Sequence, residues 1–250
     1  MLLRNGGFEG KYTARGAPEV RIAPDWEPFW LEGMPHEGQG PAMRPEFKPV
    51  TTAIDRLRIV DGDTAQGWFV RWKTMDAGVY QRVTGLQAGQ ELTFSASVQV
   101  WCSQKDNPRA DDGELYMRVG IDPTGSIDPW ADSVQWSGWK PGTKEHKRIS
   151  VTATAAGDAA TVFVRGWNKW KLSHNDAYVD AAELIVEGGE PEEPVEPVEP
   201  TEPGEPTEPS ERPGGDVAEQ LAAISAKLDK LDDIAAALER IATLLDKSNG

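Results

Sequence analysis

The chain has only one cysteine, Cys102, in 250 residues, which excludes an intrachain disulfide and a zinc site built from several cysteines. It has no apolar run that approaches the roughly 18 residues a membrane-spanning helix needs. It also lacks the G-x-S-x-G, P-loop, H-E-x-x-H and G-x-G-x-x-G signatures, and its three histidines lie far apart in the sequence. These absences predict a protein that does not insert into membranes and is not an enzyme.

Basic residues are few: 26 Lys and Arg stand against 41 Asp and Glu, giving a formal charge of -15. Such an excess of acid disfavours nucleic acid and other polyanions as partners. The acidity is concentrated in the C-terminal part, where residues 187–212 hold ten glutamates and one arginine. The first seven residues show no charged and then apolar secretory signal, so we expect a mature form, an intracellular protein or a virion component.

Residues 1–187 have the pattern of a β domain. Alternating or β-branched runs recur between Gly, Pro, Asp and Asn residues, as strands do between turns. Eight strands are predicted, at 19–22, 68–72, 79–83, 91–101, 115–121, 148–153, 161–167 and 178–186. So many strands without a helical stripe indicate an all-β fold, a two-sheet jelly-roll sandwich.

The alternation within strands predicts which side chains face the core. In 91–101 the residues Leu92, Phe94, Ala96, Val98 and Val100 form the apolar set. The same parity places Met117 and Val119 inward with Tyr116 and Arg118 outward, and Val162 and Val164 inward with Arg165 and Trp167 outward.

The segment 188–215 is expected to be a spacer. Seven Glu-Pro pairs follow one another at a spacing of three residues from Glu190 to Pro209. That period matches the three residues per turn of polyproline II, and the aligned glutamates repel one another, so the segment is expected to be extended. A disordered charged tail is the alternative, and it differs only in stiffness.

A C-terminal α-helix is predicted over 216–247. Asp216 is suited to cap it, with Glu219 three residues later. The apolar positions repeat at spacings of three and four residues, the period of a coiled coil: Val217, Leu221, Ile224, Leu228, Leu231, Ile234, Leu238, Ile241 and Leu245. We therefore expect self-association through this helix, as a dimer or a trimer, with packing on the β domain as the alternative.

The two ends of the β domain carry motifs of a known family. Asn5-Gly6-Gly7-Phe8-Glu9 opens the domain and Tyr178-Val179-Asp180 lies in its last strand. With Trp136-Ser137-Gly138-Trp139 and His174-Asn175-Asp176 between them, residues 1 to about 187 resemble jelly-roll carbohydrate-binding modules of the galactose-binding-like class. Similar modules occur in extracellular, cell-envelope and phage proteins.

The resemblance also implies a structural calcium that ties the first strand to the last. By motif position, Glu9 and Asp180 would supply side-chain oxygens and Lys11 a backbone carbonyl, which are the hard ligands that calcium takes. Ala181 departs from the pattern, because many relatives have a second aspartate there. The alternative is that Glu9 and Asp180 cap strand ends.

Sugar binding needs exposed aromatic rings beside polar side chains, because a pyranose packs its C–H face on an indole and its hydroxyls need hydrogen-bond partners. We expect such residues to share the concave face of one sheet; the predicted set is Gln81, Gln99, Trp101, Tyr116, Arg118, Arg165 and Trp167, with Trp170 and Asp176 from the adjoining loop. Trp26, Trp30, Trp136 and Trp139 are assigned instead to the core or to loop packing.

Together these features predict a non-catalytic protein that binds surface glycans multivalently. A binding head, a stiff spacer and an oligomerising helix suit adhesion or surface display, outside a cell or on a virion, for example in a phage fibre or capsid decoration. The alternative is a structural component of a virion or surface layer whose β domain contacts proteins and binds no sugar.

Overall fold

The computed structural model describes residues 2–33, 40–106 and 113–188, which fold into two β-sheets. The seven-stranded sheet has the order β1-β2-β4-β5-β13-β7-β11, and the other has the order β10-β8-β12-β6-β3 with β9 paired to β8. In chain order the strands are β1 (Thr13–Arg15), β2 (Ala17–Ile22), β3 (Glu27–Trp30), β4 (Glu46–Thr51), β5 (Thr64–Val70), β6 (Asp76–Thr84), β7 (Glu91–Ser103), β8 (Leu115–Asp122), β9 (Gln135–Trp136), β10 (Lys140–Pro141), β11 (Lys147–Thr154), β12 (Ala159–Asn168) and β13 (His174–Glu187).

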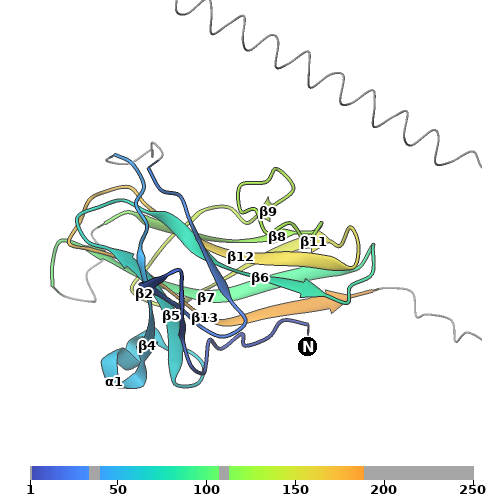
Figure 1. Cartoon of the computed structure of the whole chain (residues 1–250), viewed down its shortest axis with the longest axis horizontal. Helices are drawn as coiled ribbons and strands as arrows, with labels where there is room; N and C mark the ends of the chain where they lie inside the picture. The colour runs from blue at the N-terminus through green and yellow to red at the C-terminus, as the bar shows by residue number, and fades with distance from the viewer. Residues whose placement is uncertain (1, 34–39, 107–112, 189–250) are drawn as a thin grey trace, which may run out of the picture. The chain divides into compact units, whose positions relative to one another are not determined.

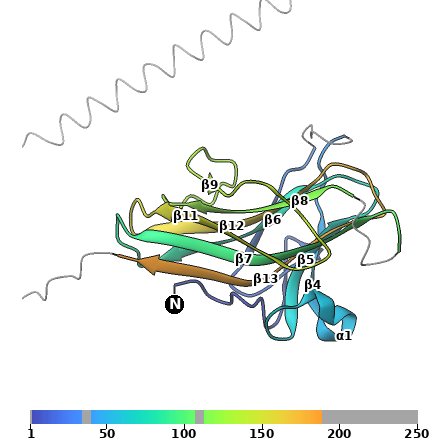
Figure 2. The same ribbon diagram turned by 180° about the vertical axis from the view of Figure 1, so that it is seen from behind.

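The two sheets face each other across one core. The inward side chains of β7 and β12, such as Phe94, Val98 and Val162, belong to the same buried cluster, and all are at most 2% exposed. Figures 1 and 2 show the two layers, with β6, β8 and β12 in one and β5, β7 and β13 in the other. The predicted β-sandwich is thus confirmed.

The alternation of apolar residues sets this packing. All five inward residues predicted in β7 are buried, and so are Met117, Val119, Val162 and Val164. All eight predicted strands are present, although β5 begins at Thr64 and ends at Val70. Trp72 cannot continue that strand because its φ of 55° lies in the left-handed region.

Two connecting segments lie on the outer faces of the sandwich. Residues 123–141 include β9 and β10, which pair with β8 along the edge opposite β12, and their tryptophans contact the outward side chains of β8 and β12. The short helices α1 (Thr52–Asp55) and η1 (Arg56–Arg58) follow β4. These segments were not predicted from the sequence, and they build the two surface sites described below.

The predicted Glu-Pro spacer and coiled-coil helix, from residue 189 onward, lie outside the described residues. Within the described ranges no helix is long and apolar enough to cross a membrane.

Candidate functional site

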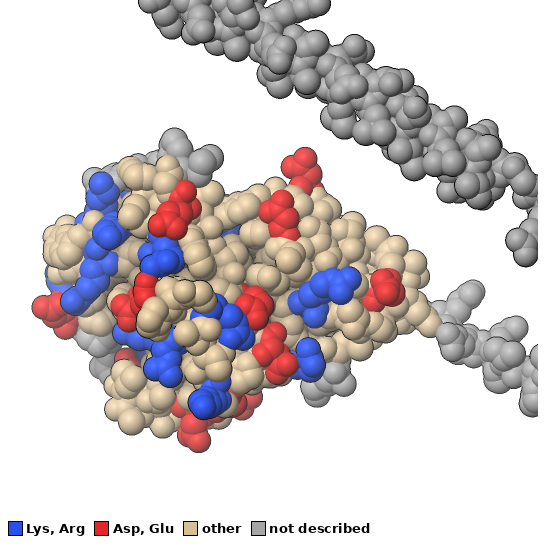
Figure 3. Space-filling view, viewed as in Figure 1, with Lys and Arg blue, Asp and Glu red and all other residues tan. Residues whose placement is uncertain are grey.

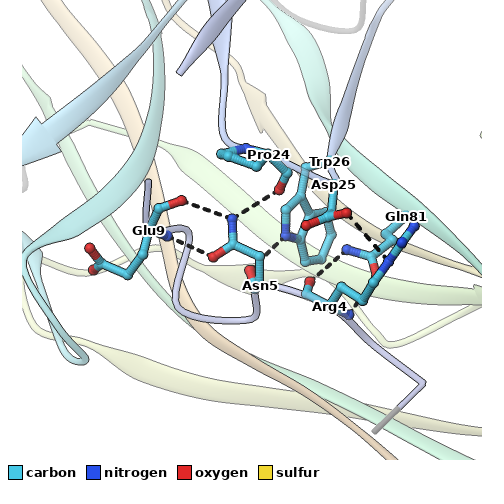
Figure 4. A network of polar contacts seen from close by, with 7 residues as sticks. All are labelled: Arg4, Asn5, Glu9, Pro24, Asp25, Trp26 and Gln81. Atoms are coloured by element: carbon cyan, nitrogen blue, oxygen red, sulfur yellow. Dashed lines mark hydrogen bonds and ion pairs between the residues drawn. The ribbon is translucent and has the colours of Figure 1, made fainter. Parts of the chain in front are cut away.

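The opening motif is a structural clasp. The side chain of Asn5 donates to the carbonyls of Glu9 (3.0 Å) and Pro24 (2.9 Å) and accepts from the Glu9 N–H (2.8 Å), while the Trp26 indole donates to the Asn5 carbonyl (Figure 4). Gly6 is required here, because a Cβ at this position would lie 2.0 Å from the carbonyl oxygen of Ala182. The motif therefore joins the N-terminal segment to the last strand, β13.

Gln81 belongs to the same clasp and not to an exposed ligand site. It is 3% exposed, its Oε1 accepts from the Arg4 N–H (2.7 Å), and its Nε2 donates to the Arg4 carbonyl (2.8 Å; Figure 4). Gln81 has the same strand parity as the core residue Val79. Its predicted outward orientation is wrong. The side-chain amide is buried because it bonds to both the N–H and the carbonyl of Arg4, as the backbone of a neighbouring strand would.

The predicted calcium ligands Glu9 and Asp180 lie near each other, because the charges of both act on the Tyr12 hydroxyl. Burial raises the pKa of this hydroxyl, and the two carboxylates raise it further. Their oxygens accept backbone N–H groups: Glu9 from residues 63 and 64, Asp180 from residues 60, 61 and 181, all at 2.7–2.9 Å. Burial raises the pKa of Asp180 to about 6 against the effect of these donors.

This donor set fits a cation poorly. Calcium takes six to eight oxygen ligands, whereas N–H groups surround these carboxylates. Lys11 is exposed, and the described residues contain no group of three or more His, Cys, Asp or Glu that could hold a metal. Calcium binding stays a prediction.

Four of the predicted ligand residues do lie together, on the outer face of the β8 and β12 layer. Arg165 pairs with Arg118 across the ladder, and Trp167 pairs with Tyr116. The segment 123–141 adds three indoles that contact these side chains. We call this surface the Trp-Arg face; it consists of Tyr116, Arg118, Trp130, Trp136, Trp139, Arg165 and Trp167.

The two arginines of the Trp-Arg face differ in their partners. Arg165 donates through Nε (2.6 Å) and Nη2 (2.5 Å) to the two carboxylate oxygens of Asp76, a buried bidentate ion pair. Its guanidinium carbon lies 4.2 Å from the ring centroid of Trp130. The positive charge of Arg165 is therefore balanced within the face.

Arg118 has no such carboxylate. Its guanidinium carbon lies 4.1 Å from the ring centroids of both Trp136 and Trp139. Its Nε is buried and has no hydrogen-bond partner among the described residues. Burial, followed by the nearby charge of Arg165, lowers the pKa of Arg118 to about 10, so it remains a cation at neutral pH.

Aromatic rings extend the face toward the chain segment after β12. The ring centroids of Tyr116 and Trp167 are 5.2 Å apart, and those of Trp139 and Trp167 are 6.2 Å apart. At the rim, Glu114 accepts hydrogen bonds from the Tyr116 hydroxyl (2.9 Å) and the Trp170 indole and lies 3.3 Å from the Lys169 ammonium. Trp170, the fifth predicted residue here, thus borders the face.

The other predicted residues, Gln99, Trp101 and Asp176, lie on the seven-stranded sheet, on β7 and β13. The expectation of one shared concave face is wrong, because β7 and β8 belong to different sheets. Trp101 pairs with Asp176 in the ladder and stacks on His174 with ring centroids 3.6 Å apart. Burial raises the pKa of Asp176, and the Tyr178 hydroxyl donates to it.

A pocket of about 440 Å³ opens on this second face, lined by Asp55, Leu57, Arg58, Gln99, Lys144, Glu145 and His146. Gln99 donates to the Lys144 carbonyl, which leaves its Oε1 buried without a partner. His146 Nε2 lies 3.1 Å from the Leu57 carbonyl, and burial lowers the pKa of its imidazole. The Nε2 atom is therefore the protonated one and Nδ1 is an acceptor.

Charges of both signs are interspersed on the face shown in Figure 3, with uncharged side chains between them.

The sequence did not indicate Asp76, Trp130 or the exposed position of Trp139 as parts of this surface. Trp130 and Trp139 are 41% and 38% exposed, so Trp139 is not a core residue, although it does pack on Arg118 and Trp167. Its Trp-Ser-Gly-Trp motif is visible in the sequence, but nothing there shows that it lies over β8. Asp76 lacks any signal, since its pairing with Arg165 spans 89 residues.

Comparison with protein families gives no match, and no curated protein matches the sequence. Solved structures do match. A cyclase from Fischerella sp. TAU aligns with a TM-score of 0.51 at 15% identity over 76% of this chain and 97% of the cyclase. A cyclase from Fischerella sp. TAU in complex with 4-(1H-indol-3-yl)butan-2-one gives a TM-score of 0.50, also at 15% identity, over 76% of this chain and 98% of the other. TmCBM61 in complex with beta-1,4-galactotriose gives 0.46 at 12% identity, over 74% of this chain and 98% of that one.

At such identities these likenesses show the fold alone: a β-sandwich that is also found in cyclases. They correct one expectation. The absence of familiar catalytic signatures predicted that the chain is not an enzyme, but the fold occurs in enzymes, so it does not mark the chain as non-catalytic.

Proposed function

We propose that the β domain binds carbohydrate on the Trp-Arg face. The observation that carries the proposal is the exposure of Trp130 and Trp139, 41% and 38%, on an outer sheet face beside Arg118 and the half-buried Trp167. Tryptophan is usually largely buried, so a cluster of exposed indoles indicates a contact surface.

The chemistry of the face suits a sugar ring. An exposed indole offers an apolar plane on which the C–H face of a pyranose packs, and flanking charged and amide groups orient its hydroxyls. Here Arg118 lies between two indoles, and Glu114 and Lys169 lie at the rim next to Trp170. The aromatic planes and the hydrogen-bonding groups therefore occur on one surface.

The test is a glycan array followed by titration of the bound glycan with the full chain and two variants. Trp139→Ala should weaken binding at least tenfold. Trp72→Ala is the matched control, because Trp72 is the most exposed tryptophan, at 59%, and lies outside the face. Equal losses in both variants, or no glycan bound while the face captures a protein partner, would instead favour the structural, protein-binding alternative.

We also propose multivalent display, outside a cell or on a virion, supported by the Glu-Pro repeat and the heptad-like pattern of 216–247. Light scattering of the full chain and of a truncation after Gly188 tests it. A dimer or trimer that becomes a monomer on truncation supports the proposal, and a monomeric full chain contradicts it.

A further inference from the structure

Arg118 is the arginine of the Trp-Arg face that has no carboxylate of its own among the described residues; Asp76 acts on it from a distance but is paired with Arg165. It takes part in no ion pair and donates no hydrogen bond to a described residue, and its Nε is buried without an acceptor. A buried donor that lacks a partner destabilises the folded protein, and more so when it is charged. Arg118 as a whole is half-buried, so its terminal groups are the part of the guanidinium that an acceptor from another molecule can reach.

The neighbouring Arg165 shows what that acceptor would be. In the same sheet and directly opposite Arg118, Arg165 offers Nε and one Nη group to the two oxygens of a single carboxylate, Asp76. The corresponding Nε edge of Arg118 has no carboxylate. Side-on pairing of this kind matches the fork of a guanidinium to a planar carboxylate, a match that a lysine ammonium cannot make.

Because its Nε is buried, the half-buried Arg118 can meet a ligand only through the terminal Nη groups at the other edge of its guanidinium. Trp136 and Trp139 each lie 4.1 Å from the guanidinium carbon of Arg118, and Trp139 is itself exposed. Stacking of the planar group between rings uses its faces, whereas hydrogen bonds lie in its plane. A ligand that reaches the edge of Arg118 also contacts Trp139.

The other charges on the face cancel. Asp76 balances Arg165, and Glu114 lies 3.3 Å from Lys169. Arg118 is then the guanidinium of the face that is left without an ion pair among the described residues, although the exposed Asp128 and Asp132 flank Trp130. A neutral sugar offers this guanidinium hydroxyl oxygens but no negative charge, and a free inorganic anion would make no use of the exposed indoles.

We propose that the Trp-Arg face recognises a glycan with a carboxylate-bearing sugar, of the uronic-acid class, with Arg118 as the residue that pairs with the carboxylate. This inference rests on the proposed carbohydrate binding and names the substrate class of the same site. Trp139 supplies the stacking plane, and Arg165 stays paired with Asp76 and supports Trp130.

The experiment compares acidic polysaccharides with their carboxyl-reduced derivatives, which keep the sugar stereochemistry and lose only the charge. Polygalacturonate, alginate and a glucuronate-containing chain are the probes, titrated against the full chain at low and high salt. At least one acidic probe should bind about ten- to a hundredfold more tightly than its reduced derivative, the range for a charge-assisted hydrogen-bonding pair.

Two variants test whether the preference for the acidic polysaccharide depends on Arg118. Arg118→Gln should abolish the preference for the acidic form, so that the acidic and the reduced polysaccharide bind this variant with equal affinity. Arg118→Lys keeps the charge but lacks the fork, so it should retain only part of the preference. Thermal melting of each variant checks that the fold is intact. If a variant does not fold, the comparison of the acidic and the reduced polysaccharide on the unaltered chain still tests the proposal.

The outcomes distinguish the proposed carbohydrate binding from the proposed recognition of a carboxylate by Arg118. Tight binding of reduced or neutral polysaccharides, lost in Trp139→Ala but indifferent to charge, keeps the proposed function and overturns the role of Arg118. An acidic preference that survives in Arg118→Gln also overturns it. Absence of binding to every polysaccharide, acidic or neutral, overturns both.

Discussion

Removal of the negative charge that balances Arg165 should destabilise the whole β domain. The Asp76 and Arg165 side chains are only 8% and 11% exposed, and two hydrogen bonds of 2.6 and 2.5 Å join them. In Asp76→Asn the guanidinium would stay buried beneath Trp130 and beside the cation Arg118. Loss of one partner of a buried pair costs about 3–5 kcal/mol, because the other charge is left uncompensated.

The matched control is the same substitution in an exposed pair. Asp25 lies 3.3 Å from Arg4, with side chains 32% and 71% exposed. Exposed pairs contribute about 0–1 kcal/mol, so Asp25→Asn should change the stability little.

Urea unfolding of the full chain, followed by tryptophan fluorescence, measures both effects. With a slope of about 2 kcal/mol per molar urea, a loss of 4 kcal/mol lowers the midpoint by about 2 M. Replacement of the pair by apolar residues, Asp76→Leu with Arg165→Met, should recover much of the loss, because no charge is then left unpaired. Equal midpoints for the Asp76 and Asp25 variants would refute the reasoning.

Three further predictions follow from the described contacts. Asn5→Ala removes three side-chain hydrogen bonds and should lower the free energy of unfolding by about 3 kcal/mol in the same urea assay; a loss below about 1 kcal/mol would contradict the clasp. Burial lowers the pKa of His146, so its contribution to stability is present above the unfolded value near 6.5 and is lost as the pH falls toward the folded value. His146→Gln should therefore lose less stability than the unaltered chain between pH 7 and 5, and parallel curves would disprove this. Because N–H groups surround the Glu9 and Asp180 carboxylates, chelation should leave the melting temperature unchanged; a lower melting temperature on chelation would show that the calcium predicted from the sequence is bound.

The alternation of apolar residues was enough to predict the strands and their buried faces. β7 shows why: every second residue from Leu92 to Cys102 is apolar, and a shift by one residue would move all of them to the other face of the sheet. The same parity predicted that Tyr116, Arg118, Arg165 and Trp167 point outward. Strand order was not needed for that result, since orientation is a local property.

Features that depend on long-range contacts could not be predicted. Gln99 and Arg118 both point outward from their strands, but only the sheet order reveals that they lie on opposite layers. Gln81 follows the parity of Val79, yet a polar residue was read as exposed, because its partner, the Arg4 backbone, lies 77 residues away. The short β3 and β4 strands carry too little alternation to be recognised.

The most direct test of the account is footprinting of the tryptophans with and without a bound glycan. N-bromosuccinimide oxidises exposed indoles, and mass spectrometry locates the products. Trp130 and Trp139 are 41% and 38% exposed, while Trp72, at 59%, is an internal reference. We expect the glycan to protect Trp130 and Trp139 and to leave Trp72 reactive. Protection confined to Trp72, or to Trp101 on the seven-stranded sheet, would contradict a carbohydrate site on the Trp-Arg face.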